Sequence, residues 1–142
     1  MELTTRGRYA VMAMADLAQF DAGEPVALAA IAERQKLSLA YLEQLFAHLR
    51  RAELVVSARG RSGGYRLGRP ASQIVISDIL GAVAEETRMT RCSGETEIGC
   101  IGGERCLTHG LWQALGVQIA AFLGSVTLHD VVSGNPATHV IV

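Results

Sequence analysis

Apolar residues in the first part of the chain recur at helical spacing, and short polar stretches separate the apolar runs. Residues 4–5 precede an apolar run from Tyr9 to Phe20, which predicts a capped helix buried on several sides. A second, short helix is expected from about Leu28 to Gln35. After a break, Ser38 is expected to cap a third helix that runs to about Ala52. Two short helices across a tight break are the layout of a helix-turn-helix.

The pattern then changes to two short strand-like runs, Leu54–Ala58 and Gly64–Leu67, on either side of a basic, glycine-rich stretch. This arrangement predicts a β-hairpin with a long tip. A further helix is expected to open at residues 77–80 and to end near Glu86. We therefore expect a mainly α fold with a small β-hairpin wing, a winged helix-turn-helix in which helices precede the hairpin.

A last long helix, from about Thr108 to Gly124, is apolar on every side. Small residues recur at every fourth position in it, which allows close approach of a second backbone. A helix that is apolar all round must bury both faces, and a second copy of the chain is the economical partner. The sequence therefore predicts a homodimer joined by this helix. Its apolar positions are Leu111, Trp112, Leu115, Ile119 and Phe122 on one stripe and Val117, Ala120 and Ala121 on the other.

These elements divide the chain into four expected segments. Residues 1–86 form a winged-helix DNA-binding domain, 87–107 a cysteine-bearing loop, 108–132 the dimerisation helix with the turn that follows it, and 133–142 a tail. No apolar run reaches the roughly 20 residues of a membrane span. No small-residue cleavage site follows the N-terminal apolar run, so we expect a cytoplasmic protein that does not enter a membrane.

Charge is unevenly distributed along the chain. Residues 1–70 hold ten Lys and Arg against seven acids, whereas the remainder holds three arginines against seven acids. A basic first half joined to an acidic second half indicates that only the first half faces a polyanion such as double-stranded DNA.

The third helix separates into two faces. One stripe is expected to be core and contains Leu39, Leu42, Leu45, Phe46 and Leu49. The opposite face carries small residues and groups that can bond base edges, namely Ala40, Gln44, Ala47 and Arg51, flanked by Tyr41, Glu43 and His48. Glutamine can address adenine and glutamate can accept from cytosine, so this face suits the major groove, although it also suits an ordinary solvated face. At the hairpin tip, Arg59 and Arg61 can reach phosphates or a narrow minor groove, the alternative being a solvated turn.

All three cysteines of the chain, Cys92, Cys100 and Cys106, fall within one segment that lacks any core pattern. His109 follows Cys106 by one helical turn, so three sulfurs and one imidazole could complete a four-ligand metal site. The gaps of seven, five and two residues contain no CxxC pair, which favours a bulky iron–sulfur cluster over zinc. The dipole of the last helix would also favour an anionic cluster. Zinc and bare thiols, including a redox pair of Cys92 and Cys106, stay open as alternatives.

Four stretches, Leu3–Val11, Ser38–Phe46, Arg59–Tyr65 and Cys106–Trp112, closely resemble those of the IscR-type iron–sulfur cluster regulators. This family of winged-helix transcription regulators also includes RirA and NsrR. The resemblance runs from residue 1 to about Val132.

The resemblance implies a non-enzymatic, dimeric regulator of cluster-assembly genes, whose cluster occupancy changes operator affinity or site choice. It implies a [2Fe–2S] cluster on Cys92, Cys100, Cys106 and His109, with cluster-assembly proteins as possible donors. It also places DNA contacts in the major groove and, through Arg59, in the minor groove; the major-groove residues are Ser38, Tyr41, Glu43 and Gln44.

Some positions depart from this pattern. Seven residues separate Cys92 from Cys100, where IscR has five, and this wider gap is similar to RirA, an iron-responsive repressor with a [4Fe–4S] cluster. Ala40 replaces a serine that IscR uses near DNA, and Arg8 lies where NsrR has a ligating aspartate. The residues also fit a zinc-stabilised or thiol-redox DNA-binding protein, or an iron–sulfur electron-transfer protein. No Ser-His-Asp or paired-carboxylate arrangement points to an enzyme.

Overall fold

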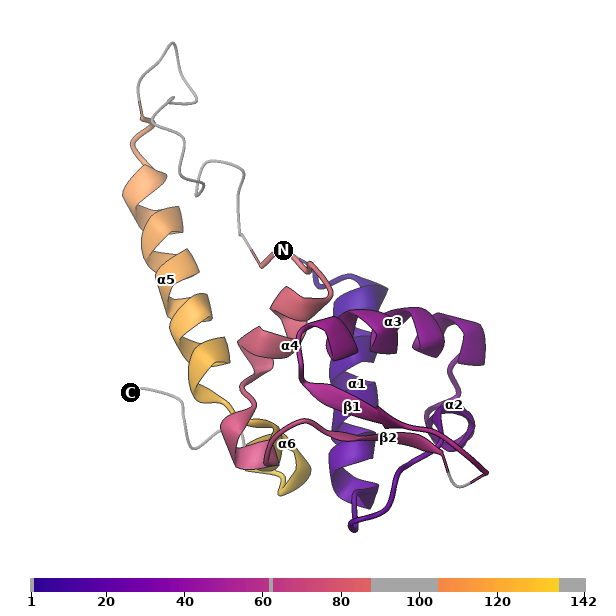
Figure 1. Cartoon of the computed structure of the whole chain (residues 1–142). Helices are drawn as coiled ribbons and strands as arrows, with labels where there is room; N and C mark the ends of the chain where they lie inside the picture. The colour runs from indigo at the N-terminus through magenta and orange to yellow at the C-terminus, as the bar shows by residue number, and fades with distance from the viewer. Residues whose placement is uncertain (1, 62, 88–104, 136–142) are drawn as a thin grey trace.

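A computed structural model describes residues 2–61, 63–87 and 105–135 of the chain (Figure 1). The described part is mainly helical and contains a single two-stranded antiparallel sheet. The elements follow in the order α1 Thr5–Phe20, α2 Leu28–Gln35, α3 Leu39–Arg51, β1 Val55–Ala58, β2 Gly64–Leu67, the 3-10 helix η1 Ala71–Gln73, α4 Ile76–Ala82, α5 His109–Ser125 and α6 Leu128–Val132.

Local signals in the sequence account for the boundaries of the first three helices. Thr4 caps α1 by accepting a hydrogen bond from the Gly7 amide, and Ser38 caps α3 by accepting one from the Tyr41 amide. Between α2 and α3, Lys36 adopts a left-handed conformation with φ of 58°, which ends α2. The predicted helix-turn-helix is therefore confirmed.

One core joins α1, α3, α4, the hairpin and α6. The core stripe predicted on α3 is confirmed for Leu42, Leu45, Phe46 and Leu49, which are all buried. The Phe46 ring packs edge-on against Tyr65 of β2, with 4.9 Å between the ring centroids. The prediction is wrong for Leu39, which is 41% exposed because it opens the helix, before the first turn that packs on the core.

The predicted hairpin is confirmed, and its second strand is tied to the loop between α1 and α2. β1 and β2 pair from Val55 opposite Leu67 to Ala58 opposite Gly64. Val26, in the loop between α1 and α2, adds a bridge to the outer side of β2, because its amide and carbonyl both bond Tyr65 at 2.8 Å. A side chain on Gly64 would meet the Val26 carbonyl oxygen at 2.3 Å, so glycine is required for this close approach.

The second half differs from the sequence-based expectation at two places. The helix expected to end near Glu86 ends at Ala82, because Ala84 takes a left-handed conformation with φ of 55°. The short helix α6 follows α5, and its Thr127 cap and Asp130 bond each other's backbone amides. Val126 and Leu128 are buried in the same core as α1. The division of the chain into four segments stays a prediction.

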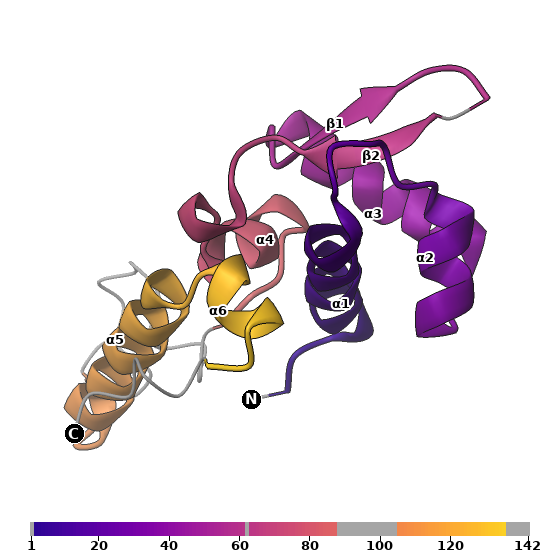
Figure 2. The same ribbon diagram turned by 90° about the horizontal axis from the view of Figure 1, so that it is seen from below.

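Helix α5 is confirmed at the expected position, and none of its residues is buried by the described part of the chain. Leu111, Val117 and Phe122 are 58%, 60% and 38% exposed. Two perpendicular views show α5 beside α4 and on the opposite side of the molecule from α2 and the hairpin tip (Figures 1 and 2). Within the described residues, no helix is long and apolar enough to cross a membrane.

Candidate DNA interface and metal ligands

A buried carboxylate on α1 holds the helix-turn-helix in place. The side chain of Asp16 is fully buried and accepts two hydrogen bonds from the Arg34 guanidinium, at 2.7 and 3.0 Å. It accepts a third from the Gln35 amide at 2.9 Å, and Arg34 also stacks 3.9 Å from the centre of the Phe20 ring. The hydrogen bonds to Asp16 raise the pKa of Arg34 above its ordinary value. Because Arg34 and Gln35 end α2, this contact fixes the turn that leads into α3.

The predicted base-reading face of α3 is on the surface. Glu43, Gln44 and Arg51 are exposed, and within residues 2–61, 63–87 and 105–135 their side chains make no hydrogen bond or ion pair. Ser38 is exposed as well, but its hydroxyl is used as the cap of α3, 3.3 Å from the Tyr41 amide. Tyr41 is half-buried, and its ring meets the Tyr9 ring edge-on at 6.1 Å. The face therefore combines free polar groups with two residues that also serve the fold.

The hairpin tip presents Arg59 and Arg61 to solvent. The Gly63 amide donates to the Gly60 carbonyl at 3.0 Å and closes the tip, while Ser62 lies outside the described residues. Neither arginine pairs with an acid or a carbonyl in the part of the chain that the structure describes. Within the described residues these two guanidinium groups have no partner, and β2 is held by Val26 and Phe46, so the arginines can reach an anionic surface.

Two of the four predicted metal ligands lie at the start of α5. Cys106 and His109 are both half-buried, and the His109 amide donates to the Cys106 carbonyl at 3.1 Å. The Cys106 sulfur lies 3.3 Å from the Thr108 hydroxyl, which also accepts a hydrogen bond from the Trp112 indole at 3.2 Å. Cys92 and Cys100 lie outside the described residues, which by themselves contain no group of three candidate ligands. A thiolate and an imidazole one turn apart suit either zinc or an iron–sulfur centre.

Reasoning from the sequence missed the residues that hold these surfaces in position. Asp16 interrupts an apolar run, and a lone acid in a buried helix is a signal for a paired cation. Glu85, three residues after α4 ends, is a second buried acid and bonds the start of α1. Its partner is 81 residues away, so no local pattern indicates it.

Comparisons with known proteins agree with this architecture. The Rrf2 family model, described as an iron-dependent transcriptional regulator, matches residues 3–134. The chain is 51% identical over 141 residues to the HTH-type transcriptional regulator IscR of Sodalis glossinidius, covering 99% of this chain and 84% of that protein. It is 51% identical over 135 residues to IscR of Xenorhabdus nematophila, covering 95% of this chain and 81% of that protein.

Solved structures show the same fold. The structure of T. potens IscR matches with a TM-score of 0.76 and 38% identity, over 94% of this chain and 88% of that one. The structure of CymR, the global cysteine regulator of B. subtilis, matches with a TM-score of 0.79 and 32% identity, over 95% of this chain and 98% of that one.

Proposed function

The chain belongs to the Rrf2 family of transcriptional regulators, a non-enzymatic class, and from this premise we propose that it is an iron–sulfur regulator similar to IscR. It binds a double-stranded DNA operator as a homodimer, and a cluster on Cys92, Cys100, Cys106 and His109 sets its affinity or choice of site. The genes it controls include those for cluster assembly, and cluster-assembly proteins are its cluster donors.

The observation that carries the DNA-binding part is the set of free polar groups on α3 and the hairpin. Glu43 and Gln44 project from a helix whose other face is buried, so their backbone positions are fixed before DNA binds. Arg59 and Arg61 stand on the adjacent hairpin without acidic partners in the described ranges. This arrangement supports base reading by α3 in the major groove and phosphate or minor-groove contact by the hairpin.

The chemistry of the donor set supports the cluster. Cys106 and His109 are partly accessible, and the other two sulfurs belong to the segment that directly precedes them in sequence. When bound, an iron–sulfur cluster supplies a redox-active, oxidation-sensitive centre. We favour [2Fe–2S] because His109 is present, while the seven-residue gap between Cys92 and Cys100 makes [4Fe–4S] the second candidate.

Metal content tests the cluster and its ligands. The chain purified without oxygen should be coloured and contain iron and sulfide, and His109→Ala should change the visible spectrum and the iron count. His129→Ala is the matched control, because His129 is an exposed histidine on α6. A colourless chain holding one zinc, or identical iron content in both variants, would contradict the proposed ligand set.

Operator titration tests the DNA-reading face. Gln44→Ala should weaken specific binding by about 1–3 kcal/mol, the value of one good base contact, and relax the preference at one base pair. Gln19→Ala removes another exposed glutamine, from α1, and should leave the affinity unchanged. Equal losses for specific and random DNA in Gln44→Ala would argue against base reading by this residue.

A further inference from the structure

The carboxylate of Glu85, three residues beyond the end of α4, bonds the N-cap residue of α1. Glu85 is only 9% exposed, and one of its oxygens accepts from the Thr4 amide at 2.8 Å. Its other oxygen accepts from the Thr4 hydroxyl. The hydrogen bonds from Thr4 hold the pKa of Glu85 below its ordinary value, although burial acts in the opposite direction. We call this contact between Glu85 and Thr4 the clasp.

The backbone on both sides of the clasp, at Gly7 and at Ala84, favours this contact. A side chain on Gly7 would lie 2.8 Å from the Glu85 side chain, so the carboxylate occupies the space that glycine leaves. On the other side, Ala84 adopts a left-handed backbone, which is disfavoured for a residue with a side chain, and this turn directs Glu85 back toward α1. Arg6 adds a second link by donating to the Ala84 carbonyl at 2.9 Å.

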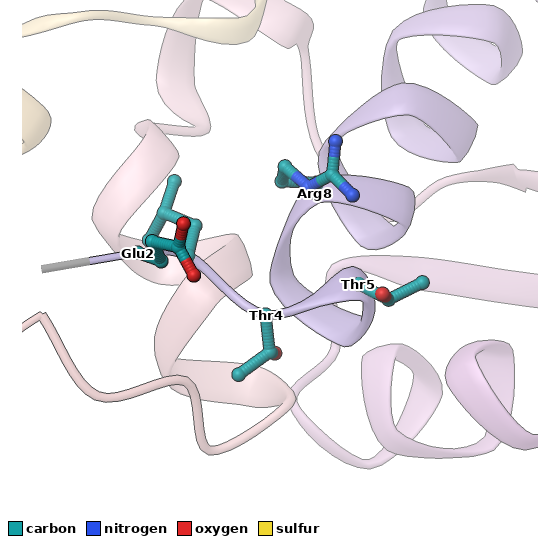
Figure 3. A pocket seen from close by; sticks show the side chains of 5 residues that line it. Glu2, Thr4, Thr5 and Arg8 are labelled. Carbon is teal, nitrogen blue, oxygen red and sulfur yellow. The ribbon is translucent and has the colours of Figure 1, made fainter.

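The clasp continues toward the recognition helix through α1. Thr4 is also the cap of α1, and the helix then places Tyr9 against Tyr41 of α3, with 6.1 Å between the ring centroids. In the close view of this end of α1, Thr4 and Arg8 point in different directions around an open pocket that both residues line (Figure 3). A displacement of the first turn of α1 would therefore move Tyr9 against Tyr41, on the helix that carries Glu43 and Gln44.

Glu85 is also close in sequence to the predicted metal ligands. Glu85 stands seven residues before Cys92, and the described residues stop at position 87. We propose that Glu85 is a positioning residue that couples metal loading of the cysteine-bearing segment to the start of α1 and, through Tyr9 and Tyr41, to the DNA-reading face. This inference rests on the proposed cluster site. It identifies the contact through which loading reaches DNA affinity.

Hydrogen exchange tests the clasp directly, because the amides of Gly7 and Arg8 bond Thr4. In the wild-type chain, metal loading should change exchange at these two amides by at least about fivefold, the low end of typical coupling between sites. In Glu85→Gln the same loading should change it by less than about twofold. Glu2→Gln removes an exposed acid beside the same turn and should behave as wild type.

A purely structural Glu85 gives a different result. Glu85→Gln would then lower the melting temperature while loading still altered the Gly7 and Arg8 amides as in wild type, and this result would overturn the proposal. If Glu85→Gln does not fold, Thr4→Ser, which keeps the hydroxyl, and Thr4→Val, which removes it, give the same comparison. Loss of the loading effect only in Thr4→Val supports the clasp, and its retention in both variants contradicts it.

Parallel measurements separate this inference from the proposed function. Iron and sulfide counts on the same samples show whether the chain is loaded, and a chain without iron contradicts the cluster site and the coupling together. In another outcome, metal loading changes hydrogen exchange in the wild type but not in Glu85→Gln, while operator affinity does not change with loading. This outcome supports the clasp and contradicts only the effect of the cluster on DNA binding. A wild-type chain that gains iron without any change at Gly7 and Arg8 overturns the clasp alone.

Discussion

Two buried carboxylates determine how the helices of this protein meet. Asp16 accepts hydrogen bonds from Arg34 and Gln35 at the end of α2, and Glu85 accepts from Thr4 at the start of α1. A buried charge is costly unless hydrogen bonds satisfy it, so each acid holds its partners in one geometry. At the scale of residues, the chain therefore uses polar contacts to orient elements that apolar packing alone would leave free to slide.

A matched pair of glycines tests the fit around Glu85. Gly7→Ala should lower the free energy of unfolding by about 1 kcal/mol, because displacing the Glu85 carboxylate loses more than helix propensity returns. Gly81→Ala should raise it by about 0.5–1 kcal/mol, since nothing lies within 4 Å of the added carbon in α4. Urea unfolding of the cluster-free chain measures both changes, and equal effects would show that the space beside Gly7 is not restrictive.

At the scale of elements, the hairpin is held along β2, while its tip carries two exposed arginines. Val26 extends the pairing beyond β2, and the Phe46–Tyr65 contact joins the sheet to α3. The Asp21 carboxylate also accepts from the Leu67 amide at 3.2 Å. None of these three contacts uses the side chain of Arg59 or Arg61, so changes to the tip arginines should affect binding without affecting the fold.

Salt dependence tests the hairpin tip. Arg59→Ala and Arg61→Ala should each weaken operator binding and reduce the slope of log affinity against log salt by about one unit. Arg105→Ala removes the same charge from an exposed position four residues before α5, a helix on the opposite side of the molecule from the hairpin tip, and should keep the slope of the wild type. An unchanged slope in both tip variants, or an equal change in Arg105→Ala, would remove the hairpin from the DNA interface.

At the scale of the whole molecule, the apolar surface of α5 stays uncovered in the described part of a single chain. Its residues are apolar on every side, and the described part of the same chain buries none of them. A second copy that packs along α5 would remove this apolar surface from water and bring two recognition helices to one duplex.

A charge on the open face of α5 tests this assembly. Val117→Glu should convert a dimer into a monomer, because it would place a carboxylate in an apolar contact, and operator affinity should fall by a factor on the order of 100. Val56→Glu adds the same charge at a half-exposed valine of β1 and should leave the dimer intact. Sedimentation velocity distinguishes the two outcomes, and a Val117→Glu chain that still sediments as a dimer would exclude this face.

Local signals predicted most of the fold. Thr4 and Ser38 cap helices where expected, and the glycine-rich stretch separates two strands. The sequence also contained an unused signal for α6, since Thr127 and Asp130 have the spacing of a capping box. The early end of α4 could not be predicted, because it depends on an alanine in a left-handed conformation that local preference disfavours.

For the candidate site, the exposed groups could be predicted and their supports could not. Periodicity alone places Gln44 on the face opposite Leu42 and Leu45, as the structure shows. The supports are pairs that are far apart in sequence, such as Thr4 with Glu85 and Asp16 with Arg34. A single sequence holds no record of which distant residues meet, so such pairs emerge only when the chain is folded.

The open surface of α5 also has a consequence for the amount of protein in the cell. A second copy can cover this helix only at a rate that rises with the square of the chain concentration, so the assembled fraction follows mass action. Dilution therefore lowers the assembled fraction. The number of chains that can place two recognition helices on one duplex then depends on the total amount of the chain.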